Sequence, residues 1–292
     1  MKIGLQGVFA GQSATAAHMI KTAKLVEDAG FHSIWMPEHV LLFEDYDSPY
    51  PYADNGRVPL DPHHVPLEPF TALAVLASHT HRLRLGTGIT ILPQRNPVYF
   101  AKQAADVDVI SGGRLDIGIG VGWLAEEFAA LNVPFERRGA RAADYIGVLK
   151  TLWCDDTSRY QGEFYQLPPC VQGPKPLQQP HPPLWFGGES KAALTRVARF
   201  GQGWYGVKLL PEDVPAHLRQ LGELLAVHGR TLDEIEIAVS PYGVPCDLDM
   251  LKRYRDAGVD QVVLFALTAD PEPLYRDIER MARELVAPAA AL

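Results

Sequence analysis

Short apolar segments alternate with longer amphipathic segments along the whole chain, and this alternation limits the possible folds more than any other feature. The short segments predict strands at 3–7, 33–36, 83–92, 115–119, 184–186, 203–207, 234–239 and 261–267. The amphipathic segments predict helices at 15–29, 67–79, 96–111, 124–131, 141–153, 192–200, 211–228, 249–257 and 271–286. Eight short strands interleaved with helices are typical of an α/β fold of the (β/α)8 barrel type, and a doubly wound open sheet is the competing architecture.

Two longer insertions, at about 40–66 and 154–182, interrupt the alternation within what is predicted to be a single domain spanning 1–292. The first is rich in proline and aromatic residues, and the pattern at 160–165 in the second predicts a hairpin. Long loops inside a compact domain usually serve binding, and loops that follow strands lie on the catalytic face of a barrel. Both insertions are therefore candidates to cover a pocket.

Composition excludes several classes of partner. The formal net charge of −8 argues against a general nucleic-acid or anionic-membrane binder, although a local site can still hold an anionic cofactor. No apolar run reaches the ~18 residues of a membrane span, and residues 1–7 are too interrupted for a signal sequence. The three cysteines are far apart, which fits a reducing compartment. A cytoplasmic protein with a small-molecule substrate is expected.

The segment Gly187-Gly188-Glu189-Ser190 follows an apolar strand and precedes an amphipathic helix. Glycines allow backbone N–H groups to approach a ligand closely, and a helix start adds partial positive charge. Ser190 stands where it can cap the helix or bind a phosphate oxygen. The segment predicts a phosphate site, and a plain strand-to-helix turn with a serine cap is the alternative.

Glu38 and His39 stand at the predicted carboxyl end of the second strand, where barrel enzymes carry catalytic groups. A histidine can donate or accept a proton near neutral pH, and the neighbouring carboxylate could orient it. We expect His39 to be the acid/base and Glu38 its orienting partner. A solvent-facing polar pair is the alternative.

Glycines also interrupt the third and fourth predicted strands. Gly86 and Gly88 indicate a bulge or a close ligand approach, with interior packing as the alternative. The alternate glycines at 118, 120 and 122 do not match a dinucleotide fingerprint, but they would expose a flat backbone surface to a planar ligand. Lys208, just past the sixth strand, is a candidate contact for an anionic group or a solvated surface lysine.

His63 and His64 are adjacent, without a further ligand at metal-binding spacing. We interpret them as part of the first insertion and expect no metal.

Taken in order, several segments resemble the luciferase-like monooxygenase superfamily, and most closely its branch of coenzyme F-420-dependent oxidoreductases. Coenzyme F-420 is an 8-hydroxy-5-deazaflavin. The matching segments are AGFHSIW at 29–35, PEH at 37–39, RLGTGI at 84–89, PQRNP at 93–97, DVISGGRL at 108–115, GIGVGW at 118–123 and PLWFGGES at 183–190.

The resemblance implies a barrel with the cofactor ring across its carboxyl-terminal mouth, a cis peptide at Gly88–Ile89, a His39 beside the reacting carbon, and a homodimer. The implied cofactor-binding residues are Gly88, Ile89, Gly120, Gly122, Trp123, Gly187, Gly188, Glu189 and Ser190. Trp123 stands where related sugar dehydrogenases carry an acidic glutamate. This departure argues against alcohol oxidation by that mechanism and makes reduction of an unsaturated or carbonyl substrate at least an equal alternative.

The resulting hypothesis is hydride transfer between coenzyme F-420 and a small organic substrate, with His39 and Glu38 as catalytic residues and Lys208 as a substrate contact. An FMN-dependent monooxygenase on the same barrel is the alternative. A metal-dependent hydrolase using Glu38, His39, His63 and His64, or a non-catalytic flavin-binding protein, is a more remote one.

Overall fold

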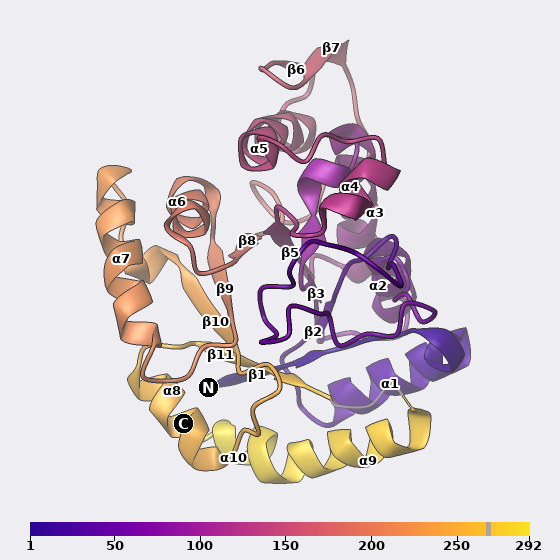
Figure 1. Cartoon of the computed structure of the whole chain (residues 1–292), viewed down its shortest axis with the longest axis vertical. Helices are drawn as coiled ribbons and strands as arrows, with labels where there is room; N and C mark the ends of the chain where they lie inside the picture. Colours follow the sequence, from indigo (N-terminus) through magenta and orange to yellow (C-terminus); the bar gives the residue numbers. More distant parts are fainter. Residues whose placement is uncertain (267–269) are drawn as a thin grey trace.

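The computed structural model describes residues 1–266 and 270–292, and parallel strands form a closed barrel at its centre (Figure 1). The strands of the barrel are β1 (Lys2–Gln6), β2 (Ser33–Met36), β3 (Arg84–Thr87) continued by β4 (Thr90–Ile91), β5 (Leu115–Gly120), β8 (Leu184–Gly187), β9 (Gly203–Val207), β10 (Glu236–Ser240) and β11 (Gln261–Phe265). The sheet closes because β1 pairs with both β2 and β11, and β3 pairs with both β2 and β5. The predicted (β/α)8 barrel is confirmed, and the open sheet is wrong.

Helices surround the barrel (Figure 1). They are α1 (Ala16–Asp28), α2 (Pro69–Ala77), α3 (Pro97–Ser111), α4 (Ala125–Ala130), α5 (Arg138–Cys154), α6 (Lys191–Phe200), α7 (Val214–Val227), α8 (Leu248–Asp256), α9 (Pro271–Met281) and α10 (Ala287–Ala289). Capping residues explain where these helices begin and end, as α3 illustrates. The Asn96 side chain accepts hydrogen bonds from the first turn of α3, and Gly112 ends that helix in the left-handed conformation with φ of +70°. Leu267, the last residue of the predicted strand 261–267, lies outside the described residues.

Aromatic side chains fill the interior of the barrel. Trp35, Trp185 and Tyr205 pack together there with Ala238 and Val263, and all are nearly inaccessible. The Trp35 ring lies over Gly86, where a Cβ atom would come within 2.3 Å of it. The glycine in this strand therefore makes room for an indole, as the packing alternative for Gly86 predicted.

The two insertions take different places. Residues 40–66 lie over the carboxyl-terminal mouth, because Asp47 N–H and Ser48 N–H bind Glu126 on α4 and Tyr50 reaches Tyr242 after β10. The hairpin of the second insertion, β6 (Ser158–Gln161) and β7 (Gln166–Cys170), packs on the outer side of α5. The first insertion therefore contacts the mouth through the hydrogen bonds of Asp47, Ser48 and Tyr50. No helix in the described part of the chain is long and apolar enough to span a membrane.

Candidate active site at the mouth of the barrel

The loop from Gly187 to Ser190 joins β8 to α6 in the predicted way. The Ser190 hydroxyl accepts a hydrogen bond from Ala193 N–H at 3.2 Å and caps the helix. Gly188 has a φ of +102°, which side-chain-bearing residues rarely adopt. Within the described ranges, the N–H groups of Lys191 and Ala192 have no acceptor. The loop therefore offers free N–H donors at a helix start, which suits an anion.

Two arginines that the sequence analysis missed lie near this loop. Arg138, at the start of α5, donates from Nε to the Gly122 carbonyl at 3.0 Å. Arg196, on α6, places Nη1 3.5 Å from the position that a Cβ atom would take at Gly139. Burial, and then the charge of Arg138, lowers the pKa of Arg196. Arg138 packs on the Phe135 ring, and neither guanidinium has a carboxylate partner among residues 1–266 and 270–292. Their charge is therefore available to an anion.

The Glu189 side chain turns back into the protein. Its carboxylate accepts hydrogen bonds from Val207 N–H at 2.7 Å and from the Tyr52 hydroxyl at 3.4 Å. Burial raises the pKa of Glu189, and the Val207 N–H opposes this shift. Glu189 thus ties the loop to β9 and to the first insertion, and its role toward a cofactor remains a prediction.

A bulge separates β3 from β4 at the mouth. The Gly88–Ile89 peptide bond is cis, as the resemblance implies. Gln6 Nε2 donates to the Gly88 carbonyl at 3.0 Å, and the Tyr205 hydroxyl donates to Gln6 Oε1 at 3.0 Å. The Thr87 and Thr90 hydroxyls both donate to the Gly118 carbonyl at 2.8 Å. The bulge is therefore held from both sides by side chains of the barrel interior.

The glycines around this bulge accommodate the Ile89 side chain. A Cβ atom at Gly120 or Gly187 would lie 2.6 Å or 2.5 Å from Ile89 Cδ1. At Gly122, whose φ is +81°, a Cβ atom would meet Phe128 at 2.7 Å. The small size of these residues has a packing cause, so the expected flat surface for a planar ligand is not needed to explain them. Their contact with a cofactor remains a prediction.

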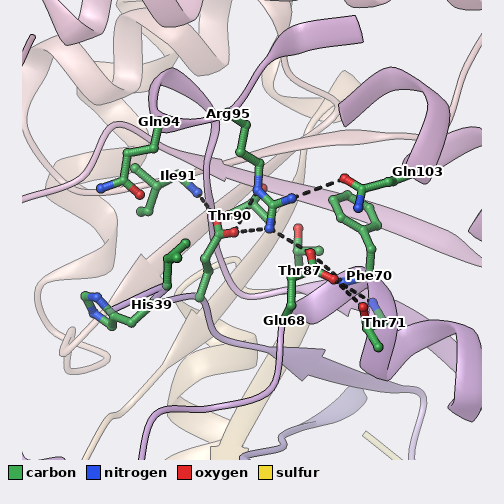
Figure 2. Close-up of polar contacts among 12 residues, drawn as sticks. His39, Glu68, Phe70, Thr71, Thr87, Thr90, Ile91, Gln94, Arg95 and Gln103 are labelled. Carbon is green, nitrogen blue, oxygen red and sulfur yellow. Dashed lines mark hydrogen bonds and ion pairs between the residues drawn. The ribbon is translucent and has the colours of Figure 1, made fainter. Parts of the chain in front are cut away.

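The structure places the Glu38 side chain against Arg95 and Ile91 rather than against His39. Its side chain is buried and binds Ile91 N–H at 2.5 Å and both Nε, at 2.7 Å, and Nη2 of Arg95. Arg95 also donates to Glu68 at 2.7 Å, while His39 points away from this ion-pair network (Figure 2). Burial raises the pKa of Glu38, and the Arg95 guanidinium opposes that shift. Among the described residues, the contacts of Glu38 are therefore with Arg95 and Ile91, and the imidazole of His39 has a different carboxylate partner.

The carboxylate that contacts His39 is Glu127 on α4. Its Oε2 lies 3.3 Å from His39 Nδ1 and accepts from Gln94 Nε2 at 3.1 Å. Its Oε1 accepts from Val40 N–H at 2.6 Å and Leu41 N–H at 3.1 Å. Glu127 is far from His39 in the sequence. The available signal was the pair of glutamates in the first turn of α4, just after a barrel strand.

Aromatic rings form one wall of the site. The Trp123 ring packs edge-on against His39, Tyr46 and Tyr50, with centroid distances of 5.8, 5.6 and 5.1 Å. The Tyr50 hydroxyl donates to the Tyr242 hydroxyl at 3.0 Å. Burial raises the pKa of Tyr50, so it stays a neutral phenol at physiological pH. Trp123 therefore joins the histidine to the first insertion.

Lys208, His63 and His64 each lie close to a carboxylate of the first insertion. Lys208 Nζ lies 3.0 Å from Asp54 Oδ1. His63 lies 3.5 Å from Glu44, and His64 lies 3.1 Å from Asp61. Within the described part of the chain, no three His, Cys, Asp or Glu side chains form a group able to hold a metal.

Two surface cavities of about 440 and 1130 Å³ lie around Lys2, at the opposite end of the barrel. None of the residues predicted for the site lines them.

The sequence matches the family model of the luciferase-like monooxygenases over residues 4–246. The chain therefore belongs to the luciferase-like monooxygenase family, which is a family of oxidoreductases.

Individual relatives differ in what their names state. An uncharacterized protein of Mycobacterium tuberculosis is 31% identical over 270 residues, covering 90% of this chain and 92% of the relative. The oxygenase component of a flavin-dependent trigonelline monooxygenase of Acinetobacter baylyi is 35% identical over 169 residues, which is 57% of this chain and 41% of the relative. The coenzyme F420-dependent tetrahydromethanopterin reductase of Methanopyrus kandleri superposes with a TM-score of 0.77 over 98% of this chain and 99% of its own. That structure is 18% identical, so the likeness concerns the fold alone.

Proposed function

We propose that this chain is an oxidoreductase that transfers a hydride between coenzyme F-420 and a small organic substrate. The observation that carries the proposal is the contact of His39 with a buried carboxylate at the mouth of a luciferase-like barrel. Hydride transfer to a carbonyl or an activated double bond requires a proton for the atom that becomes negative. A histidine held by a carboxylate can supply that proton.

The residues present fit a phosphate-bearing deazaflavin or flavin. The free N–H groups at the start of α6 and the guanidiniums of Arg138 and Arg196 match the donors that bind phosphate. Gly187 and Gly188 would let the ligand approach the backbone, and Ser190 would add a hydroxyl. The bulge at Gly88 and Ile89 and the neighbouring Gly120, Gly122 and Trp123 are proposed to contact the ring.

When bound, the deazaflavin supplies or accepts the hydride. His39 Nε2 has no hydrogen-bond partner in the described part of the chain, which leaves it free to exchange a proton with the substrate. Trp123, Tyr46 and Tyr50 exclude water from this side of the histidine. Their rings favour a substrate with an apolar or aromatic face. We also propose that Lys208 exchanges its contact with Asp54 for an anionic substrate group when one is present.

FMN-dependent monooxygenation is the second candidate. The Acinetobacter baylyi relative, whose name states a flavin-dependent monooxygenase, favours it. The residues that we propose to bind phosphate would suit FMN as well as F-420. The homodimer and the cytoplasmic location remain predictions.

The proposed reaction is tested by turnover. The protein is mixed anaerobically with reduced F-420 and a panel of small ketones, enones and imines, and F-420 oxidation is followed by absorbance. We expect oxygen-independent turnover with at least one substrate class. We also expect His39→Ala to slow it by about two to four orders of magnitude, the usual effect of losing an acid/base. Product formation only with reduced FMN and oxygen would support monooxygenation instead.

A further inference from the structure

We infer that Glu127 is the positioning residue of this site. The inference rests on the proposed function only for the identity of the reaction. It fixes which nitrogen of His39 carries the proton, and it holds the first residues of the insertion 40–66 in place. The two tasks depend on one carboxylate, because each of its oxygens has its own set of partners.

Glu127 is bound so completely that it can only be an acceptor. Its side chain is 1% exposed. Oε1 accepts from the Val40 and Leu41 N–H groups, and Oε2 accepts from Gln94 Nε2. A carboxylate in this position has no proton to share, so the His39 Nδ1 that faces it must be protonated. The other nitrogen, Nε2, is then the acceptor in neutral imidazole and the acid in imidazolium.

The charge state of Glu127 supports this arrangement. Burial alone would raise the pKa of the Glu127 carboxyl, but hydrogen bonds from His39, Gln94 and Leu41 outweigh burial and lower it. The carboxylate is therefore ionised at neutral pH and accepts the hydrogen bond from His39 Nδ1–H. A carboxylate that accepts this hydrogen bond orients the histidine for acid–base catalysis.

The other charged groups around the histidine are engaged elsewhere. Glu38, on the same strand end, is bound to Arg95. Glu126, next to Glu127 on α4, accepts from Asp47 N–H at 2.7 Å and Ser48 N–H at 3.2 Å. The aromatic neighbour, Trp123, carries no charge. Glu127 is consequently the one charged group in the described structure that is hydrogen-bonded to the imidazole.

Glu126 provides a matched control. Both glutamates lie in the first turn of α4, and both bind two N–H groups of the first insertion. Only Glu127 also contacts the histidine. A variant at Glu126 therefore measures the effect of loosening the insertion, without a change at the imidazole.

In the variant Glu127→Gln we expect the opposite tautomer of the His39 imidazole. The Val40 and Leu41 N–H groups require an acceptor, so the amide oxygen takes the place of Oε1. The amide NH2 then faces His39 Nδ1, which must become an acceptor. The proton moves to Nε2, and the nitrogen that faces the mouth can no longer accept one.

The test is 15N NMR of the imidazoles in the full chain, with the His39 signal assigned by its loss in His39→Ala. We expect Nδ1–H in the wild type and in Glu126→Gln, and Nε2–H in Glu127→Gln. If Glu127→Gln does not fold, Glu127→Asp takes its place; it keeps the charge but lengthens the contact, so a mixture of tautomers is expected. An unchanged tautomer in the folded variant, or the same change in Glu126→Gln, would overturn the inference.

Kinetics add a second readout where turnover is found. Glu127→Gln should lower kcat by about 100-fold or more and move the pH profile of kcat, with little change in the KM for cofactor. Glu126→Gln should leave the pH profile in place. The NMR result needs neither cofactor nor substrate. A failure of the proposed function therefore leaves the tautomer test intact, and a failed tautomer test leaves the cofactor question open.

Discussion

Glu38 and His39 are neighbours in the chain, yet they act on opposite sides of the strand end. Glu38 enters the protein and holds Arg95 and the Ile91 N–H, whereas His39 faces the mouth and contacts Glu127. The sequence places acid and base side by side and so suggests that they work together. In the structure the two side chains have separate partners, so adjacency in the sequence does not make them a pair.

Because Glu38 is bound to Arg95 inside the protein, we expect its loss to lower the free energy of unfolding. Glu38→Gln leaves the Arg95 guanidinium buried, with Glu68 as its remaining charged partner in the described part of the chain. Removing one member of a buried ion pair typically costs about 3–5 kcal/mol, and the remaining Glu68 should keep the loss at about 3 kcal/mol. The free energy of unfolding is measured by urea denaturation at pH 7.

Glu68→Gln is the control for this prediction, because the Glu68 side chain is 35% exposed and that of Glu38 is 2% exposed. The control should lose clearly less stability. Equal losses in the two variants would contradict the assignment of Glu38 to the folded core.

At the scale of elements, the strand-ending glycines and the bulge form one unit. Gly120 and Gly187 lie on two different strands, and both leave space for the Ile89 side chain of a third. The sequence indicates each glycine separately, as a strand interruption or a ligand approach. It cannot show that one isoleucine fills the space beside both, because that contact depends on the register of three neighbouring strands.

A substitution in the loop between β8 and α6 tests whether this loop binds the cofactor. Gly188→Ala places a Cβ atom 3.2 Å from that of Ala193 and strains a φ of +102°. The loop should shift and cofactor affinity should fall by about tenfold or more, since bound phosphate depends on the loop amides. Affinity is measured by fluorescence titration.

Gly229→Ala is the matched control, since Gly229 also has a positive φ, of +68°, but a Cβ atom there meets nothing within 4 Å. It lies after α7, away from the loop, and should leave affinity unchanged. A folded Gly188→Ala variant with wild-type affinity would favour a purely structural turn.

At the scale of the whole molecule, the barrel could be predicted from the alternation of segments, and most helices begin and end within a few residues of the predicted ranges. The positions of the glycine loop and of His39 at the mouth could also be predicted, because strand ends meet on one face of a barrel. The side chains that contact His39 and the bulge, or that supply positive charge, could not be predicted. Glu127, Arg138 and Arg196 reach the site from helices, and no local pattern indicates which helix residue faces a strand end.

The first insertion shows the same limit. Its aromatic content predicts a cover for the mouth, and the contacts of Tyr50 with Trp123 and Tyr242 bear this out. The second insertion has a similar length and packs outside the barrel, on α5. The difference depends on tertiary contacts, since the α5 residue Asp144 accepts N–H groups from Phe164 and Tyr165 of the hairpin.

The central claim is that this barrel mouth binds a deazaflavin and uses it for hydride transfer. The most direct measurement is a fluorescence titration of the cofactor-free protein with oxidised F-420 and, separately, with FMN, under identical buffer and salt. Salt must match because both ligands are anionic and the site is cationic. We expect F-420 to bind at least about tenfold more tightly than FMN. This preference rests on the sequence resemblance, because the proposed phosphate site suits both cofactors. Tighter binding of FMN, or no binding of F-420, would contradict it.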